Sequence, residues 1–345
     1  MTRRRALLLG GAAWLAAGDA ARSQVRGVPP WYASGTLQRE VRFAGADGAT
    51  LSGTLMLPLA SEIQPVPGVV LIAGSGPTDR DGNTPLIPAR IDTLKLIAAR
   101  LAAAGIATLR YDKRGVGRSS PPPEGLAAQE RFFRWDHAVA DAVAAHTELL
   151  RHDEIKSYAT AFLGHSEGGL LALAALAGLD PRKRPHALAL ASTPGRPMAD
   201  IVRAQIARTA PTFAADADRI VTTILDSGRV PADMPAELRP VFPAYAGPFL
   251  RDLFAFDPAA ALARLDTACL LIHGGADSLI VPFADIQPLI DGLGKRNATG
   301  EALVVPAVSH NLKTVYNGTD PGYIGALAPA VGDKLAQWLG AVLGA

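Results

Sequence analysis

Ser166 is a small polar residue that interrupts two apolar segments. The stretch AFLGHSEGGLLALAAL (161–176) places it between Gly164 and Gly168, after one apolar run and before a second run with helical character. A strand that turns sharply into a helix needs small neighbours, because larger side chains there collide with adjacent backbone. The G-x-S-x-G pattern is typical of a nucleophile elbow, which exposes the serine Oγ above a sheet. The alternative is a serine that only caps a helix after a glycine turn.

A serine hydroxyl needs a general base and an orienting carboxylate before it can attack a carbonyl carbon. In proteins with a nucleophile elbow these two partners follow the serine in the order Asp, His, each after a later strand. Asp277 follows the apolar run ACLLIHGG (268–275), and His310 follows ALVVP (302–306). The sequence therefore predicts a triad of Ser166, His310 and Asp277.

The other six histidines fit the role of the base less well. His165 adjoins the nucleophile and is expected to pack the elbow, and His273 precedes the acid in the same loop, where we expect a structural role. The remaining four lie on the helix-like segment before the elbow or on the wrong side of a strand: His137, His146, His152 and His186.

The oxyanion that forms after nucleophilic attack needs two hydrogen-bond donors. One is expected to be the main-chain N–H of Glu167, at the start of the helix whose positive dipole end favours negative charge. The second is expected from the loop VVLIAGSGPTDRDGN (69–83), through the N–H of Ser75 or of Gly76. The sequence does not decide between these two residues.

The same loop contains two misleading patterns. In DRDGN, Gly82 comes too early for a calcium-binding loop, and the twelfth position is Arg90 instead of an acidic residue. The stretch GSGPTD lacks the Gly-Lys-Ser/Thr of a phosphate-binding loop.

Cys269 is the only cysteine, which excludes an internal disulfide and a thiolate metal cluster. No metal site is predicted.

The segment RGVGRSS (114–120) resembles a dinucleotide-binding fingerprint but has no glycine in the third place. We expect a rigid turn here that supports the oxyanion loop, built by Asp112, Arg114, Gly115 and Gly117.

Strand-like and helix-like segments alternate along most of the chain. The segment 37–58 alternates apolar and polar residues around Asp47-Gly48, which predicts a hairpin. Continuous apolar strands between helices indicate an α/β fold with a parallel sheet covered on both faces. Strands are expected at 66–74, 106–112, 158–164, 186–192, 268–275 and 302–306, and helices at 91–104, 133–151, after Ser166, at 283–293 and up to Leu343.

The stretch from Arg196 to about Leu265 breaks this alternation. It holds helix-like pieces and a proline-rich part, VPADMPAELRPVFPAYAGPF (230–249), without a convincing strand. An insertion between two core strands is expected to form a helical lid over the carboxyl ends of the sheet. The apolar residues of this insertion are expected either to line a pocket for an acyl group or to pack the lid against the core. They are Val241, Phe242, Tyr245, Phe249, Leu253 and Phe254.

Residues 1–22 have the layout of a secretory signal peptide, with a basic start, an apolar stretch and small residues. The stretch TRRRAL resembles a twin-arginine signal, and an ordinary Sec signal is the alternative. The apolar stretch from Ala6 to Ala17 is shorter than the ~20 residues that span a bilayer, and no cysteine follows it for lipid attachment. We expect an exported, periplasmic protein without a stable membrane anchor, whose folded domain covers 31–345.

The rest of the chain is almost neutral. The formal net charge of the whole chain is +2, and it falls to zero when Arg3, Arg4, Arg5 and Asp19 near the N-terminus are left out. The remaining basic residues are scattered, so they form no stripe that would favour nucleic-acid binding. The sequence gives no indication of the oligomeric state.

Five segments together resemble the α/β-hydrolase superfamily, and within it bacterial carboxylesterases with a lid similar to that of serine aminopeptidases such as proline iminopeptidase. These are GSGPTDRDGN (74–83), YDKRGVGRS (111–119), GHSEGG (164–169), GGADSLIVP (274–282) and SHNL (309–312). The resemblance implies a mostly parallel eight-stranded sheet and ester hydrolysis through an acyl-enzyme, without a metal or organic cofactor. One departure is Ala73, where many relatives carry the His of a His-Gly oxyanion motif.

The leading interpretation is a serine carboxylesterase acting on a small-molecule ester. An aminopeptidase of the proline-iminopeptidase type is the alternative, and it would need acidic residues near the site to bind a free amino terminus. Asp216, Asp218 and Asp226 are candidates for that role, or they form a solvated helix face. A third interpretation is a binding protein on a hydrolase scaffold, although such scaffolds usually lose the nucleophile or the base.

Overall fold

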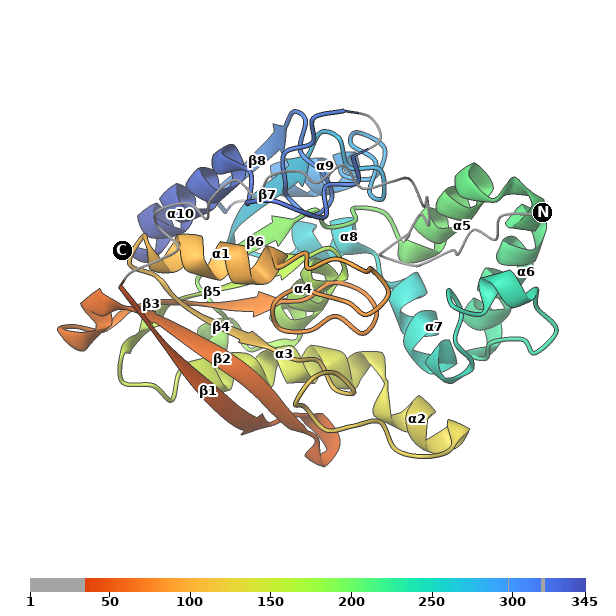
Figure 1. Ribbon diagram of the computed structural model, residues 1–345, viewed down its shortest axis with the longest axis horizontal. Coiled ribbons are helices and arrows are strands. Elements are labelled where there is room, and N and C mark those ends of the chain that lie inside the picture. The colour runs from red at the N-terminus through yellow and green to blue at the C-terminus, as the bar shows by residue number, and fades with distance from the viewer. Residues whose placement is uncertain (1–34, 297, 318–319) are drawn as a thin grey trace.

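Eight strands form one sheet in the order β1-β2-β4-β3-β5-β6-β7-β8 (Figure 1). The computed structural model describes residues 35–296, 298–317 and 320–345. The predicted signal peptide at 1–22 lies outside the described residues. The strands are β1 (Thr36–Ala44), β2 (Thr50–Pro58), β3 (Val66–Ile72), β4 (Ala107–Tyr111), β5 (Ile155–His165), β6 (Ala187–Ala191), β7 (Ala268–Gly274) and β8 (Gly300–Val305).

The strands from β4 to β8 in this order are all parallel, and β2 alone runs against the sheet, because it pairs antiparallel with both β1 and β4. Every residue of β3, β4 and β6 is buried, as expected for strands covered on both faces. The hairpin turns at Asp47 and Gly48, which both have positive φ. The predicted mostly parallel eight-stranded α/β fold is confirmed.

Helices cover both faces of the sheet (Figure 1). Two helices, α1 (Thr93–Ala102) and α10 (Pro329–Leu343), pack together on one face. The opposite face is covered by α3 (Trp135–Leu149), α4 (Glu167–Gly178), α8 (Pro258–Ala263) and α9 (Gln287–Gly294). Two apolar cores lie between the helices and the sheet, and both are built from apolar residues of the strands and of the helices.

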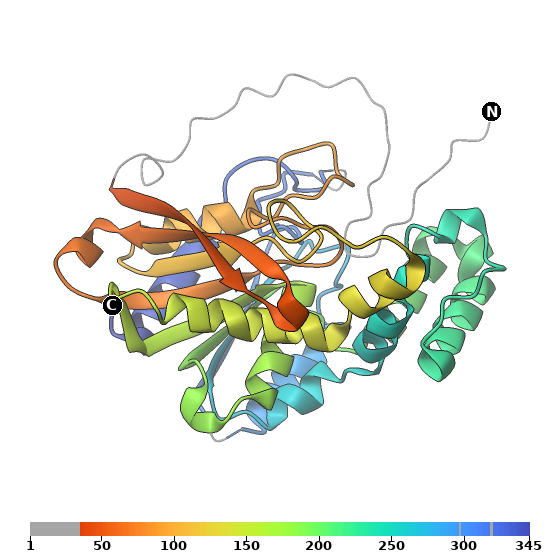
Figure 2. The same cartoon turned by 90° about the horizontal axis from the view of Figure 1, so that it is seen from below.

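The chain between β6 and β7 forms a helical insertion beyond the carboxyl ends of the strands (Figures 1 and 2). It contains α5 (Met198–Thr209), α6 (Ala214–Ser227) and α7 (Gly247–Ala255), and α8 leads back to the sheet. No strand lies in this segment, all of which the structure describes. Aromatic contacts join it to the main domain, because Tyr245 packs on Phe133 and Phe249 packs on Trp135.

Two helices differ from the sequence prediction. A short helix, α2 (Leu126–Phe132), was not predicted and lies beside α7 (Figure 2). The helix predicted at 283–293 begins only at Gln287, because Phe283 has a φ of 70° and the Asp285 carboxylate accepts a hydrogen bond from the Val281 N–H. None of the described helices is long and apolar enough to cross a membrane.

Candidate active site

Ser166 connects β5 to α4 in a backbone conformation that glycine-rich surroundings make possible. Its φ of 56° and ψ of −126° lie outside the regions that most residues adopt. A Cβ at Gly164 would collide with the Gly168 backbone, and a Cβ at Gly168 would collide with the carbonyl oxygens of Ile72 and Ala73. The helix therefore approaches the strands so closely that only glycine fits, and this contact maintains the turn at Ser166.

Asp277 and His310 meet at the carboxyl edge of the sheet. Each lies in the loop after a strand, β7 and β8 respectively, and their side chains are joined by a 2.8 Å hydrogen bond between His310 Nδ1 and Asp277 Oδ2. Because an ionised carboxylate only accepts hydrogen bonds, the bond places a proton on Nδ1. The other ring nitrogen, Nε2, is then an acceptor.

Several donors surround the Asp277 carboxylate. The main-chain N–H groups of Leu279 and Ile280 donate to Oδ1 at 2.8 and 2.9 Å, and His273 Nε2 lies 3.3 Å from Oδ2. Burial by itself would raise the pKa of Asp277. The neighbouring His310 and the hydrogen bonds from both histidines outweigh it and hold the pKa well below its ordinary value. The carboxylate is therefore charged at neutral pH.

The free nitrogen of His310 is buried and unpaired. No described residue makes a hydrogen bond to His310 Nε2, and His310 and Ser166 are each only 5% exposed. The structure thus shows no bond between Ser166 Oγ and His310 Nε2. An acceptor without a partner costs free energy in a folded protein, and such groups often mark a place where a ligand or a reacting group binds.

His165 links the elbow directly to the His310 loop. Its Nε2 donates to the main-chain oxygen of His310 at 2.8 Å, and the two rings lie 5.1 Å apart. Burial lowers the pKa of His165 to about 4, so the ring is neutral and keeps a proton for this bond. The residue next to Ser166 therefore positions the backbone of His310. From the sequence alone, only a packing role is predicted for His165.

The loop after β3 lies against Ser166. A Cβ at Gly74 would lie 3.2 Å from Ser166 Cβ. Within the described residues, no acceptor pairs with the main-chain N–H of Ser75, Gly76 or Glu167. These groups are free to bind an anion, and both Ser75 and Gly76 stay candidates for the second donor.

Charged residues brace this loop from the side of β4. Arg80 binds Asp112 through its main-chain N–H and its guanidinium, at 2.9 and 2.8 Å. Asp112 also accepts the N–H of Arg118, and Gly117 lies so close to its carboxylate that a Cβ would not fit. This turn therefore supports the loop after β3, for which the sequence predicts an oxyanion role.

Arg114 and Gly115 serve a different contact. Arg114 forms a buried ion pair with Asp141 of α3, at 2.7 Å, and a Cβ at Gly115 would collide with Phe133. These two residues join the turn to α2 and α3 instead of to the oxyanion loop.

The insertion is tied to the loop that carries Asp277. Gln205 and Arg208 of α5 donate to the carbonyl oxygens of Leu279 and Ser278, at 2.9 and 2.8 Å. Arg196 pairs with the buried carboxylate of Asp285. Since Leu279 also orients Asp277, the insertion helps to hold the acid in place.

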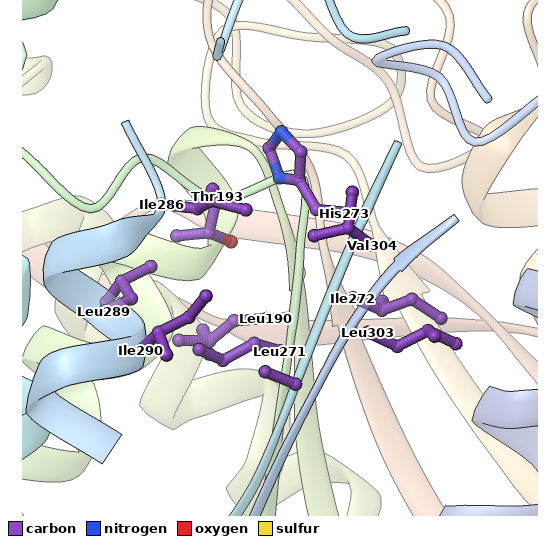
Figure 3. A pocket seen from close by; sticks show the side chains of 11 residues that line it. Leu190, Thr193, Leu271, Ile272, His273, Ile286, Leu289, Ile290, Leu303 and Val304 are labelled. Carbon is purple, nitrogen blue, oxygen red and sulfur yellow. The ribbon is translucent and has the colours of Figure 1, made fainter. Parts of the chain in front are cut away.

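Two cavities lie away from Ser166. One, of about 10 Å³, lies between α9 and strands β6 to β8, with apolar side chains around it and His273 at its edge (Figure 3). It has room for about one water molecule at most. The other, of about 360 Å³, lies between α1, α10 and the loop around Ile324, and none of the candidate residues lines it. Over the described part of the chain, no group of three or more His, Cys, Asp or Glu residues is arranged to hold a metal ion.

The comparisons with known proteins support this architecture. Over 292 residues the chain is 27% identical to esterase EstD of Thermotoga maritima. The aligned region covers 84% of this chain but only 65% of that relative. Est1E from Butyrivibrio proteoclasticus has a similar fold, with a TM-score of 0.58 and 16% identity over 90% of this chain and 100% of that one.

An esterase of Pyrococcus furiosus is similar as well, with a TM-score of 0.56 and 17% identity over 89% of this chain and 91% of the other. None of these similarities bears on the resemblance of the insertion to a serine-aminopeptidase lid, which stays a prediction. The model of the alpha/beta hydrolase family matches residues 69–321, and the chain belongs to this family.

Proposed function

We propose that the protein is a serine esterase that hydrolyses small carboxylic esters through an acyl-enzyme. The observation that carries this proposal is the arrangement around His310. Its Nδ1 is bonded to a charged, buried Asp277, its Nε2 has no partner among the described residues, and His165 ties its backbone to the residue beside Ser166. An imidazole prepared in this way is suited to accept a proton from a serine hydroxyl.

In the first step Ser166 Oγ attacks the ester carbonyl carbon while its proton moves to His310 Nε2. The carbonyl oxygen becomes an oxyanion that accepts hydrogen bonds from the N–H of Glu167 and of Ser75 or Gly76. Asp277 stabilises the imidazolium without taking its proton. The bond to the alcohol then breaks, the alcohol leaves with the proton from His310, and the acyl group stays on Ser166.

In the second step water replaces the alcohol. His310 Nε2 takes a proton from the water as its oxygen attacks the acyl carbon, and the same donors bind the second oxyanion. The bond to Ser166 Oγ breaks, the proton returns from His310 to the serine, and the carboxylic acid is released. No cofactor enters either step.

The position of the acidic residues favours an ester over a peptide substrate. Asp216 and Asp218 lie on α6, paired with Arg219 and Arg203, and Asp226 is exposed near the end of the same helix. These residues form a solvated helix face. The apolar residues of the insertion are used in packing, since Phe242, Leu253 and Phe254 are buried in the apolar core. By analogy with the family, we propose short- to medium-chain esters as substrates.

A fluorophosphonate probe and a series of p-nitrophenyl esters test the proposal. We expect the probe to label wild-type protein at Ser166, and Ser166→Ala to lose both labelling and ester hydrolysis. Ser227→Ala, on the exposed end of α6, is the matched control and is expected to leave both unchanged. Folded wild-type protein that is neither labelled nor active would favour a binding protein. Faster turnover of aminoacyl p-nitroanilides than of esters would favour an aminopeptidase.

We also propose that the protein is exported to the periplasm and that residues 1–22 are removed on the way. This proposal rests on the sequence pattern alone. Expression of the full chain followed by mass spectrometry of the periplasmic fraction tests it. A mature protein that still begins at residue 1, or one found only in the cytoplasm, would contradict it.

A further inference from the structure

Lys113 is a mostly buried lysine for which the proposed mechanism has no role. It follows β4, and its side chain is only 15% exposed. Its Nζ donates to the carbonyl oxygen of Gly74 at 2.5 Å and lies 3.6 Å from Oε1 of Glu167. One ammonium group therefore contacts both segments that carry the candidate oxyanion donors.

The sheet order explains how one side chain reaches both segments. Strands β4, β3 and β5 are neighbours and run parallel, so the loops after them meet at the same edge. Lys113 extends from the end of β4 across the loop after β3 to the first residue of the helix after β5. The main chain at Lys113 is itself held, because its carbonyl oxygen accepts the N–H of Val116 at 3.0 Å.

The Glu167 carboxylate is a difficult neighbour for an oxyanion hole. Its side chain is 6% exposed, and the residue directly follows Ser166, where negative charge gathers in the transition state. An unbalanced anion at this place would oppose that charge, and more strongly in a buried site than in water. The Lys113 ammonium balances the carboxylate. Burial lowers the pKa of Lys113, and the charge on Glu167 acts in the opposite direction.

We propose that Lys113 is a positioning residue of the oxyanion hole. Its ammonium fixes the Gly74 carbonyl, so that the following N–H groups face the reacting carbonyl, and it neutralises Glu167 beside the other donor. The inference rests on the proposed function and adds a residue to it. Lys113 acts through main-chain donors, so its effect is expected in the transition state more than in substrate binding.

Lys113→Met tests the proposal because methionine keeps an unbranched apolar stem and removes the ammonium. We expect kcat for a p-nitrophenyl ester to fall about 10- to 100-fold, somewhat less than the loss of a direct oxyanion donor. We expect KM to change less than about threefold and the pH dependence of kcat/KM to stay the same, because Asp277 and His310 are untouched. Lys334→Met, which removes a lysine of α10 that pairs with Glu301 of β8, is the matched control and is expected to leave kcat unchanged.

A double variant distinguishes the loss of the counter-charge to Glu167 from a general loss of structure around the site. Lys113→Met leaves Glu167 buried without a counter-charge, so Lys113→Met/Glu167→Gln is expected to fold more stably and to recover part of the lost kcat. A folded Lys113→Met protein with wild-type kcat, or with a changed KM alone, overturns the proposal. So does a double variant as slow as the single one. If Lys113→Met does not fold, a folded double variant with wild-type kcat overturns it.

The same assay distinguishes this inference from the proposed function. Wild-type protein that is neither labelled at Ser166 nor active on esters overturns both. Active wild-type protein together with a fully active Lys113→Met overturns only the role of Lys113.

Discussion

Asp277→Asn separates the charge of the acid from its shape. In the structure Oδ1 accepts two main-chain N–H groups, from Leu279 and Ile280, while Oδ2 faces His310. An asparagine at this position has to place its oxygen at the two N–H groups, because its NH₂ group cannot accept hydrogen bonds. The NH₂ group then points at His310 Nδ1.

This orientation forces the wrong tautomer on His310. An NH₂ group can only donate, so Nδ1 has to become the acceptor and the proton moves to Nε2, the atom that takes the proton of Ser166 in the proposed mechanism. The asparagine also removes the negative charge that stabilises the imidazolium. In serine hydrolase triads the equivalent change lowers kcat about 10⁴-fold, which corresponds to about 5 kcal/mol of activation free energy.

The measurement is kcat for a p-nitrophenyl ester between pH 6 and 10, with circular dichroism to confirm folding. We expect a loss of about 10⁴-fold at pH 7, and little change in KM, because the Asp277 side chain is fully buried and so out of reach of the substrate. Asp333→Asn, an exposed residue of α10 that pairs with Arg100, is the matched control with normal turnover. A folded Asp277→Asn protein that loses less than about tenfold would refute the assignment of Asp277 as the orienting acid.

Two further predictions concern folding. Gly168→Ala is expected to lower the free energy of unfolding by more than about 2 kcal/mol, because its Cβ would collide with the carbonyl groups of Ile72 and Ala73. Gly178→Ala, at the end of the same helix, introduces a Cβ that meets no atom, so it is expected to be neutral or slightly stabilising. Equal midpoints of urea unfolding for the two variants would contradict this account. Burial lowers the pKa values of His146 and His165 to about 4, so the unfolded chain binds more protons than the folded one below about pH 6.5. This contribution to stability is therefore fully present above that pH and is lost towards pH 4, by about 3 kcal/mol for each histidine. In His146→Gln the free energy of unfolding in urea is expected to depend less steeply on pH, and a pH dependence equal to that of wild type would show that folding does not lower the pKa of His146.

Much of the architecture could be predicted because the relevant signals are local. Continuous apolar runs indicated β3 and β6, and the alternation around Asp47 indicated the β1–β2 hairpin. The glycines around Ser166 predicted a sharp turn, and in the structure a side chain at Gly168 would collide with the carbonyl oxygens of Ile72 and Ala73. The helix α2 was missed because its short sequence has no buried residue and therefore no apolar periodicity.

The relations between distant loops could not be predicted in the same way. The sequence placed Asp277 and His310 after strands, and chain order alone suggested that they meet. That His165 holds the His310 carbonyl, and that Lys113 reaches Gly74 and Glu167, depends on which strands are neighbours. Strand order is set by crossover connections and packing over the whole sheet, so no short stretch of sequence contains it. The residue types that could do chemistry were determined by the sequence itself, and the tertiary structure decided which of them touch.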